Sequence, residues 1–211
     1  MVMAKAPVAG LVKTRLCPPC SAEQAAAIAE AALCDTLAAV ADASADRRVL
    51  ALCGPPGSWL PDGFTVVEQR GAALAERLSH AVSLVPTGRL LVVGMDTPQC
   101  TPALLDAGFT ALESCDAALG PATDGGYWAL GLRAAYRGVF DRVPMSAAET
   151  GARQLARLRE LGLRTGLLPS LTDVDSFADA EQVAAEVPGS RFAGAVAEAR
   201  STFLVPLADY S

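Results

Sequence analysis

Near its start the chain reads AKAPVAGLVKTRL over residues 4–16, between a very short apolar segment and a long alanine-rich one. The protein has seventeen basic residues, and its only two lysines, Lys5 and Lys13, both lie in this stretch. Lysine carries a compact charge that suits a phosphate oxygen, and glycine lets the backbone come close to a ligand. The stretch therefore favours an anion-binding loop after a first strand, with an ordinary solvated surface loop as the alternative.

The composition is that of a folded chain with a substantial core. Its 211 residues are 52% hydrophobic and 19% charged, so we expect a single domain over residues 1–211. The net charge of −6 argues against a nucleic-acid partner, which normally selects a basic surface. We find no signal peptide and no run near the roughly 18 apolar residues of a membrane-spanning helix. These features predict a cytoplasmic protein that does not enter a membrane.

The six cysteines form no obvious disulfide or metal pattern. Cys17 and Cys20 enclose two prolines in a C-x-x-C arrangement before a helix, which is typical of redox proteins. Against a redox role, a cationic loop of twelve residues separates the pair from the first strand. A zinc site would need more ligands, and His80 is the only histidine. We favour two incidental cysteines that flank a rigid turn, with a redox motif as the alternative.

Apolar runs and helix caps alternate along the chain. Residues 89–95 form the strongest strand, apolar almost throughout, as expected of a central parallel strand covered on both faces. Ser21 and Gln24 fit a capping box, and Thr101 followed by Pro102 marks another helix start. We predict further strands over 48–53, 64–67, 116–120, 127–132 and 164–168, and helices over 21–43, 69–85, 101–114, 147–161, 178–186 and 193–200.

The alternation of strands and helices predicts the α/β class, as a three-layer α/β/α sandwich with a mostly parallel, mixed sheet. Residues 119–132 break the alternation, because two strand-like runs follow each other there without a helix between them. We see no internal repeat and no interdomain linker.

Charged residues follow several of the predicted strands, and ligands of open α/β sheets bind at the carboxyl ends of strands. The first loop, Asp96 and the pair Asp173 and Asp175 all hold such positions. A hard cation such as Mg²⁺ binds one or two carboxylates together with phosphate oxygens. Asp96 with Asp175, or with Asp173, would supply that pair. The alternative is that Asp96 is a turn or N-cap residue and that the other two lie in a solvated turn.

Five blocks of sequence, taken together, form a recognisable pattern. Residues 4–16 fill A-K-x-P-x-x-G-x-x-K-T-R-L, and the blocks at 69–77, 94–98, 120–127 and 173–175 continue it. The chain thereby resembles the nucleotide-diphospho-sugar transferase fold, called GT-A. It most resembles a bacterial family labelled "glycosyltransferase, rSAM/selenodomain-associated", related to molybdenum-cofactor cytidylyltransferase and phospholactate guanylyltransferase. The resemblance covers nearly the whole chain.

The resemblance also implies roles for individual residues. It implies that Lys13, Arg15 and Asp96 are catalytic, with the two cations on the phosphates. It implies that Asp96 and Asp175 hold Mg²⁺ or Mn²⁺. The nucleotide would be bound by Ala4, Lys5, Ala6, Pro7, Gly10, Thr14 and Gln69. The acceptor or sugar side would be lined by Asp124, Gly125, Gly126 and Tyr127.

One block departs from the family pattern. Where the family has G-D-L-G-E-R, this chain has Ala73 and Ala75 in the places of the aspartate and the second glycine. If that aspartate touches substrate, the departure implies a different substrate preference or a weaker activity.

Two enzymatic functions fit the resemblance. Nucleotidyl transfer would join a nucleoside triphosphate to a small phosphorylated or carboxylated acceptor, and glycosyl transfer would use a nucleotide sugar, with Asp124 as the candidate base. We favour nucleotidyl transfer, because a triphosphate and its pyrophosphate demand the most cationic charge and Lys13 and Arg15 supply it. A nucleotide-binding module without turnover is a third alternative, and a homodimer is left open.

Overall fold

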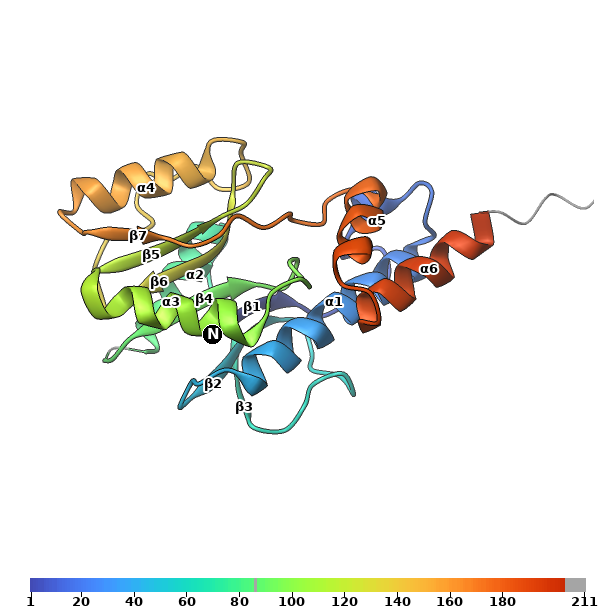
Figure 1. Ribbon diagram of the computed structural model, residues 1–211, viewed down its shortest axis with the longest axis horizontal. Helices are drawn as coiled ribbons and strands as arrows, with labels where there is room; N and C mark the ends of the chain where they lie inside the picture. Colours follow the sequence, from blue (N-terminus) through green and yellow to red (C-terminus); the bar gives the residue numbers. More distant parts are fainter. Residues whose placement is uncertain (86, 204–211) are drawn as a thin grey trace, which may run out of the picture.

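The computed structural model describes residues 1–85 and 87–203, and its centre is one seven-stranded sheet (Figure 1). The strand order is β3-β2-β1-β4-β6-β5-β7. The strands are β1 (Val2–Lys5), β2 (Arg48–Cys53), β3 (Phe64–Glu68), β4 (Leu90–Gly94), β5 (Ala117–Pro121), β6 (Tyr127–Leu132) and β7 (Thr165–Leu167). The helices are α1 (Ala22–Asp42), α2 (Leu74–Ser83), α3 (Pro102–Ser114), α4 (Thr150–Glu160), α5 (Phe177–Glu186) and α6 (Arg191–Phe203), with a 3₁₀ helix η1 (Thr14–Leu16).

The sheet is parallel except at β6, which runs antiparallel to both β4 and β5. This single reversed strand explains the break in alternation at 119–132, because a strand pair joined by a short turn needs no crossover helix. β4 is buried along most of its length, as its apolar sequence predicted. The first two residues of the opening stretch, Ala4 and Lys5, belong to β1 and not to the loop.

Helices cover both faces of the sheet, which confirms the predicted three-layer architecture. α1 and α3 pack on one face, around a core that includes Leu33, Leu37 and Leu112. α2 and α4 pack on the other face, around Leu78 and Leu158. α5 and α6 lie beyond the sheet and pack against the first part of α1 (Figure 1).

α1 begins at the predicted capping box, in which the Ser21 hydroxyl accepts from the Gln24 N–H and the Gln24 side chain accepts from the Ser21 N–H. Its 21 residues are apolar enough, by length and composition alone, to cross a membrane. The expectation that no stretch of this kind exists is therefore wrong. More than half of that window is buried inside the protein, so α1 is a core helix and no membrane protein is indicated.

Two helices start later than predicted. The helix expected from residue 69 begins at Leu74, because Gly71 has a φ of +129°, a left-handed backbone that interrupts a helix. The helix expected from residue 147 begins at Thr150, after Ser146 at a φ of +60°. In both cases a turn that faces the carboxyl end of the sheet replaces the first helical turn.

Ala73 is the N-cap residue of α2, and no side chain caps this helix. The family's aspartate therefore falls at a position where a carboxylate accepts hydrogen bonds from the first free N–H groups of the helix. Ala73 is exposed and does not line the cleft described below. The departure from the family pattern thus leaves α2 without a side-chain cap.

Restoring the acid should stabilise the protein. We expect Ala73→Asp to add about 1 kcal/mol to the free energy of unfolding, because the new carboxylate caps α2. In a protein of this size that corresponds to a rise in Tm of roughly 2–4 °C, measurable by thermal denaturation. Ala135→Asp, which adds the same charge at an exposed position outside any helix, is the matched control. An equal rise in both variants, or none in Ala73→Asp, would contradict the capping role.

Candidate functional site

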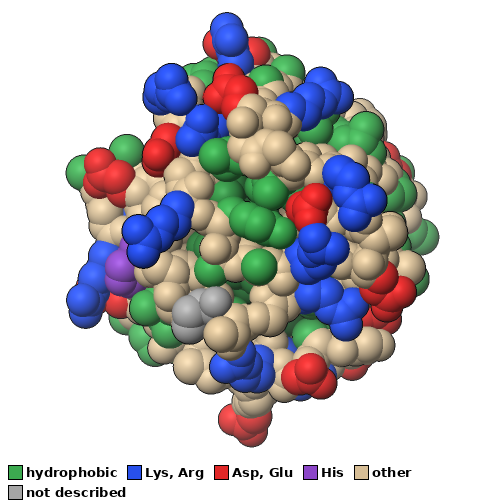
Figure 2. Space-filling view, turned by 90° about the vertical axis from the view of Figure 1, so that its left-hand side faces the viewer, with side chains coloured by type: hydrophobic (Ala, Val, Ile, Leu, Met, Phe, Trp, Pro, Cys, Tyr) green, Lys and Arg blue, Asp and Glu red, His purple; other side chains and the backbone are tan. Residues whose placement is uncertain are grey.

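Two hollows lie at opposite ends of the sheet. One, of about 580 Å³, lies near the start of β1 and β4, and Figure 2 views the molecule from this side, with hydrophobic side chains gathered in the middle of the face. Three of its charged side chains have partners: Asp106 accepts from the N–H of Ser44 at 2.9 Å, and Arg89 lies 3.5 Å from Glu113. The other, a cleft of about 710 Å³, lies at the carboxyl ends of β1 and β4 and contains most of the predicted site residues.

The first loop delivers Lys13 into this cleft. Lys13 has a φ of 47° and precedes η1, whose Leu16 is fully buried and fixes the loop against the core. The side chain of Lys13 is only 9% exposed, and its Nζ lies 2.8 Å from Asp96 Oδ1 and 4.0 Å from Asp175 Oδ1. The same ammonium donates a hydrogen bond to the carbonyl of Val174. Lys13 is therefore held by carboxylates in this structure.

Backbone hydrogen bonds bring the segment after β7 to the same place. The N–H of Val174 donates to the carbonyl of Asp96 at 3.2 Å. The N–H of Leu171 donates to the carbonyl of Pro121, and the N–H of Thr123 donates to the carbonyl of Leu171. The two bonds of Leu171 extend the parallel pairing of β5 and β7 beyond the strands. They place the chain around Asp173 beside the turn that carries Asp124.

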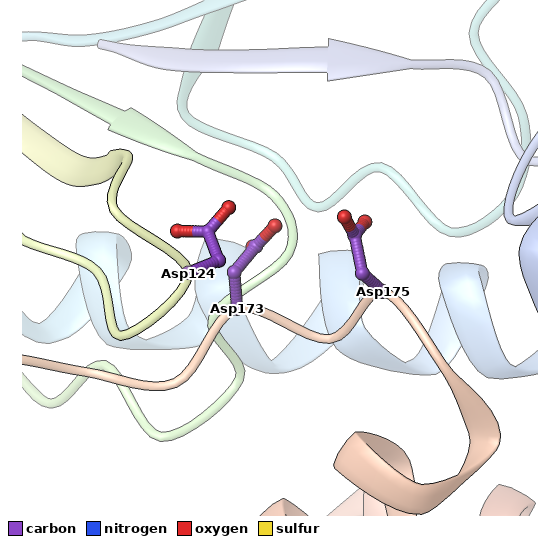
Figure 3. A group of neighbouring side chains, drawn as sticks. All are labelled: Asp124, Asp173 and Asp175. Carbon is purple, nitrogen blue, oxygen red and sulfur yellow. The ribbon is translucent and has the colours of Figure 1, made fainter. Parts of the chain in front are cut away.

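Three carboxylates meet at this point. Asp124, Asp173 and Asp175 each offer an oxygen within 4.8 Å of the others, and Figure 3 shows all three side chains pointing toward the side on which β1 lies. Arg15 Nη1 lies 2.6 Å from Asp175 Oδ2, so it neutralises part of this cluster. Four carboxylates, with Asp96 included, face two cations, which leaves a formal charge of −2 when all are ionised.

The pKa values of Asp173 and Lys13 are both raised in this cluster. Burial, together with the neighbouring Asp96, Asp175 and Asp124 carboxylates, raises the pKa of Asp173 to about 7, although Lys13 acts in the opposite direction. Burial alone would lower the pKa of Lys13, but Asp96, Asp173 and Asp175 outweigh it and the pKa is raised. Lys13 thus keeps its positive charge, whereas Asp173 binds a proton more readily than an ordinary aspartate does.

Gly125 is required for the turn that presents Asp124. It has a φ of +90°, and a Cβ there would lie 1.8 Å from the carbonyl oxygen of Ala148. The N–H of Gly151 donates to the carbonyl of Gly125, so the start of α4 packs directly on the turn. Asp124 in turn accepts from the N–H of Gly126 at 2.8 Å. The carboxylate is therefore set by backbone contacts on both sides.

The structure brings most of the predicted site residues into the cleft. Its lining includes Ala4, Lys5, Lys13, Thr14, Arg15, Gln69, Asp96, Asp124, Gly126, Tyr127 and Asp175. The lining does not include Ala6, Pro7, Gly10 or Gly125. Their expected roles, and those of the lining residues, stay predictions.

The side chains of two predicted site residues already make hydrogen bonds within the protein. The amide of Gln69 donates to the carbonyls of Ala4 and Ala51, both at 2.8 Å, and so ties the ends of β1 and β2 together. Tyr127 is largely buried, its hydroxyl lies 3.4 Å from Gln154 Oε1, and burial raises its pKa. Arg15, in contrast, is 73% exposed and open to a ligand.

The predicted metal pair is divided between two groupings. Asp175 lies with Asp124 and Asp173, whereas Asp96 forms the ion pair with Lys13. Asp124, predicted to line the acceptor side, lies close to Asp173, and no pattern in the sequence indicated this closeness. Arg77 also lines the cleft and was given no role, although it ends one of the five motif blocks.

The C-x-x-C pair lies outside this cleft. All six cysteines are free, and Cys20 is buried. Burial, and the neighbouring Cys17, raise the pKa of the Cys20 thiol. Neither cysteine lines the cleft, so the interpretation of two incidental cysteines stays a prediction.

A family model described as "Uncharacterized protein conserved in bacteria (DUF2064)" matches residues 24–147. The chain belongs to this family. The matched residues include Asp96 and Asp124 but neither the first loop nor the segment from Asp173 to Asp175. No curated protein matches the chain.

Solved structures show the fold over nearly the whole chain. A protein from Desulfovibrio desulfuricans G20, provisionally called a nucleotide-diphospho-sugar transferase, is 25% identical with a TM-score of 0.85, over 95% of this chain and 94% of that one. Rv0371c from Mycobacterium tuberculosis H37Rv is 19% identical with a TM-score of 0.56, over 86% and 94% of the two chains. The 2-C-methyl-D-erythritol 4-phosphate cytidylyltransferase from Thermus thermophilus is 18% identical with a TM-score of 0.51, over 94% and 98%. The predicted nucleotide-diphospho-sugar transferase fold is confirmed.

The raised pKa of Asp173 predicts a pH dependence of stability in metal-free buffer. The folded pKa of about 7 lies above the ordinary value of 3.8, so the stabilising contribution is complete below about pH 4 and is lost as the pH rises to 7. With EDTA present, Tm of the wild type should fall more between pH 5 and pH 8 than Tm of Asp173→Asn. Asp141→Asn, at an exposed position, should behave as the wild type does. Identical pH profiles for the wild type and Asp173→Asn would contradict this assignment.

Proposed function

We propose that this protein is a metal-dependent transferase that uses a nucleotide, and that it transfers a nucleotidyl group from a nucleoside triphosphate to a small phosphorylated or carboxylated acceptor. The observation that carries the proposal is the meeting of three carboxylates with a cationic loop in one cleft. Phosphate groups and the divalent cations that accompany them require both signs of charge at close range.

The residues of the cluster fit a divalent cation. Carboxylate oxygens are the ligands that Mg²⁺ and Mn²⁺ prefer, and the formal charge of −2 is the charge that such an ion would balance. In the proposal Asp124, Asp173 and Asp175 hold the ion, and Asp96 is a further candidate ligand from its predicted role. Bound there, the ion would supply positive charge for the phosphate oxygens of the nucleotide.

The chain's own residues bind and orient the reacting groups. Arg15 and Lys13 would hold phosphate oxygens, and Lys5, exposed at the end of β1 and without an ion-pair partner among the described residues, would add a third cation. An oxygen of the acceptor attacks the α-phosphorus, a new P–O bond forms, and the bond to pyrophosphate breaks. Because the acceptor is already an oxyanion, no protein nucleophile is needed, and positioning with charge neutralisation lowers the barrier.

Glycosyl transfer is the second candidate, and one observation favours it. The protein from Desulfovibrio desulfuricans G20 carries the name of a nucleotide-diphospho-sugar transferase at 25% identity. In this reaction an acceptor hydroxyl would attack the anomeric carbon and a nucleoside diphosphate would leave, with Asp124 as the base. The third alternative, a nucleotide-binding module without turnover, would take its support from the departure at Ala73, which lies at the start of α2 and outside the cleft lining.

A panel of nucleotides in a thermal-shift assay tests the proposal. We expect nucleoside triphosphates with Mg²⁺ or Mn²⁺ to raise Tm more than nucleotide sugars, and EDTA to abolish the effect. A ligand at one hundred times its Kd adds about 2.7 kcal/mol to the free energy of unfolding. For this chain length the rise in Tm is roughly 5–10 °C.

Two variants make the comparison specific. Asp175→Asn should lose the metal-dependent part of the shift, whereas Asp62→Asn, which removes an exposed carboxylate outside the cleft, should keep it. A larger shift with nucleotide sugars than with triphosphates would favour glycosyl transfer. No shift with any nucleotide would contradict both transferase proposals.

A further inference from the structure

Arg77 stands apart from the other arginines of the chain. Nine of the fifteen make an ion pair or donate a side-chain hydrogen bond within the described residues. Five of the remaining six are exposed, namely Arg47, Arg137, Arg142, Arg153 and Arg159. Arg77 is only partly exposed, its buried Nε has no hydrogen-bond partner in the described part of the chain, and the residue lines the cleft.

The local structure fixes where Arg77 stands. A Cβ on Gly71 would lie 2.9 Å from the backbone nitrogen of Arg77, so the preceding turn packs directly on the first turn of α2. The Ala72 N–H donates to Glu76 Oε2 at 2.8 Å and closes the same turn. Gln69 anchors the other end of the turn to β1 and β2. These contacts within residues 69–77 therefore fix the position of Arg77 at the cleft.

Arg77 shares the cleft with several apolar side chains of the α2 and α4 face. Leu74 and Leu78 come from its own helix, Tyr127 comes from β6, and Met145 comes from the segment before α4. Leu78 belongs to the core on the α2 and α4 face of the sheet, and the other three are partly buried and pack against it. No carboxylate from this face pairs with the guanidinium in the described residues. The acidic residues of the cleft come instead from loops at the ends of β4, β5 and β7.

The unpaired Nε is closed to solvent, which is costly, and no bond among the described residues engages the other nitrogens of this guanidinium, whose residue lines the cleft. Arginine grips phosphate and carboxylate groups through its planar fork. We propose that Arg77 anchors an oxyanion, phosphate or carboxylate, of the acceptor molecule, whose apolar body packs against Leu74, Leu78, Tyr127 and Met145. This inference rests on the proposed function, which places the nucleotide at Lys13 and Arg15. It assigns to the cleft a second anion site, separate from the acidic cluster, and so defines the acceptor class.

Binding of simple probes, without nucleotide or metal, tests the site by itself. In calorimetric titrations phenyl phosphate or benzoate should bind saturably to the wild type, and neutral benzyl alcohol should not. Whichever of the two anions binds more tightly identifies the oxyanion. Arg77→Gln should lower the affinity for that anion roughly tenfold or more, because charge-assisted hydrogen bonds are lost. The affinity of Arg77→Lys for the anion should lie between those of the wild type and Arg77→Gln, because lysine keeps the charge but lacks the planar fork.

Controls separate this inference from the proposed function. Arg153→Gln removes an exposed, unpaired arginine and should leave binding of the probes unchanged. Arg77→Gln should also keep the Tm shift given by a triphosphate with Mg²⁺, and that retention shows that the variant is folded. Anion binding that depends on Arg77 stands even if no nucleotide binds. Unchanged anion affinity in Arg77→Gln, absence of saturable anion binding to the wild type, or a loss confined to the triphosphate would overturn the assignment.

Discussion

The site depends on the buried ammonium of Lys13. This single charge joins three segments that are far apart in the sequence: its own loop, the tip of β4 through the Asp96 carboxylate, and the segment after β7 through the Val174 carbonyl. The N–H of Val174 closes the ring by donating to the carbonyl of Asp96. A buried ammonium is tolerated only where carboxylates and carbonyls replace its water, so this contact specifies how the three segments meet.

The same contact explains why the cluster is suited to a ligand and is more than a structural ion pair. Lys13 and Arg15 together neutralise only two of four carboxylates, and burial with the neighbouring carboxylates raises the pKa of Asp173 to about 7. A cluster optimised for stability alone would not retain two excess negative charges near one point. On the α2 face the imbalance is reversed, since Arg77 has no anionic partner in the described residues. In the two proposals, the acidic cluster holds the divalent cation and Arg77 holds an oxyanion of the acceptor.

Much of this could be predicted from the sequence, because it depends on local patterns. Three features can be recognised from a few neighbouring residues: the apolar run of β4, the capping box at Ser21 and the two lysines near the first loop. The pairing of β5 with β7 joins distant residues, so the closeness of Asp124 to Asp173 could not be read from spacing. The unpaired state of Arg77 is also invisible in the sequence, since it depends on what every neighbouring element fails to provide. Similarly, Ala73 can be recognised as the N-cap residue only once the start of α2 at Leu74 is known.

The central claim is that the three carboxylates beside Lys13 bind a divalent cation together with phosphate. The most direct measurement is anomalous diffraction from crystals grown with Mn²⁺ and pyrophosphate. The account predicts an anomalous peak among Asp124, Asp173 and Asp175, with pyrophosphate density beside Lys13 and Arg15. The absence of any peak at these carboxylates, with Lys13 still paired to Asp96 and pyrophosphate bound elsewhere or not at all, would contradict it.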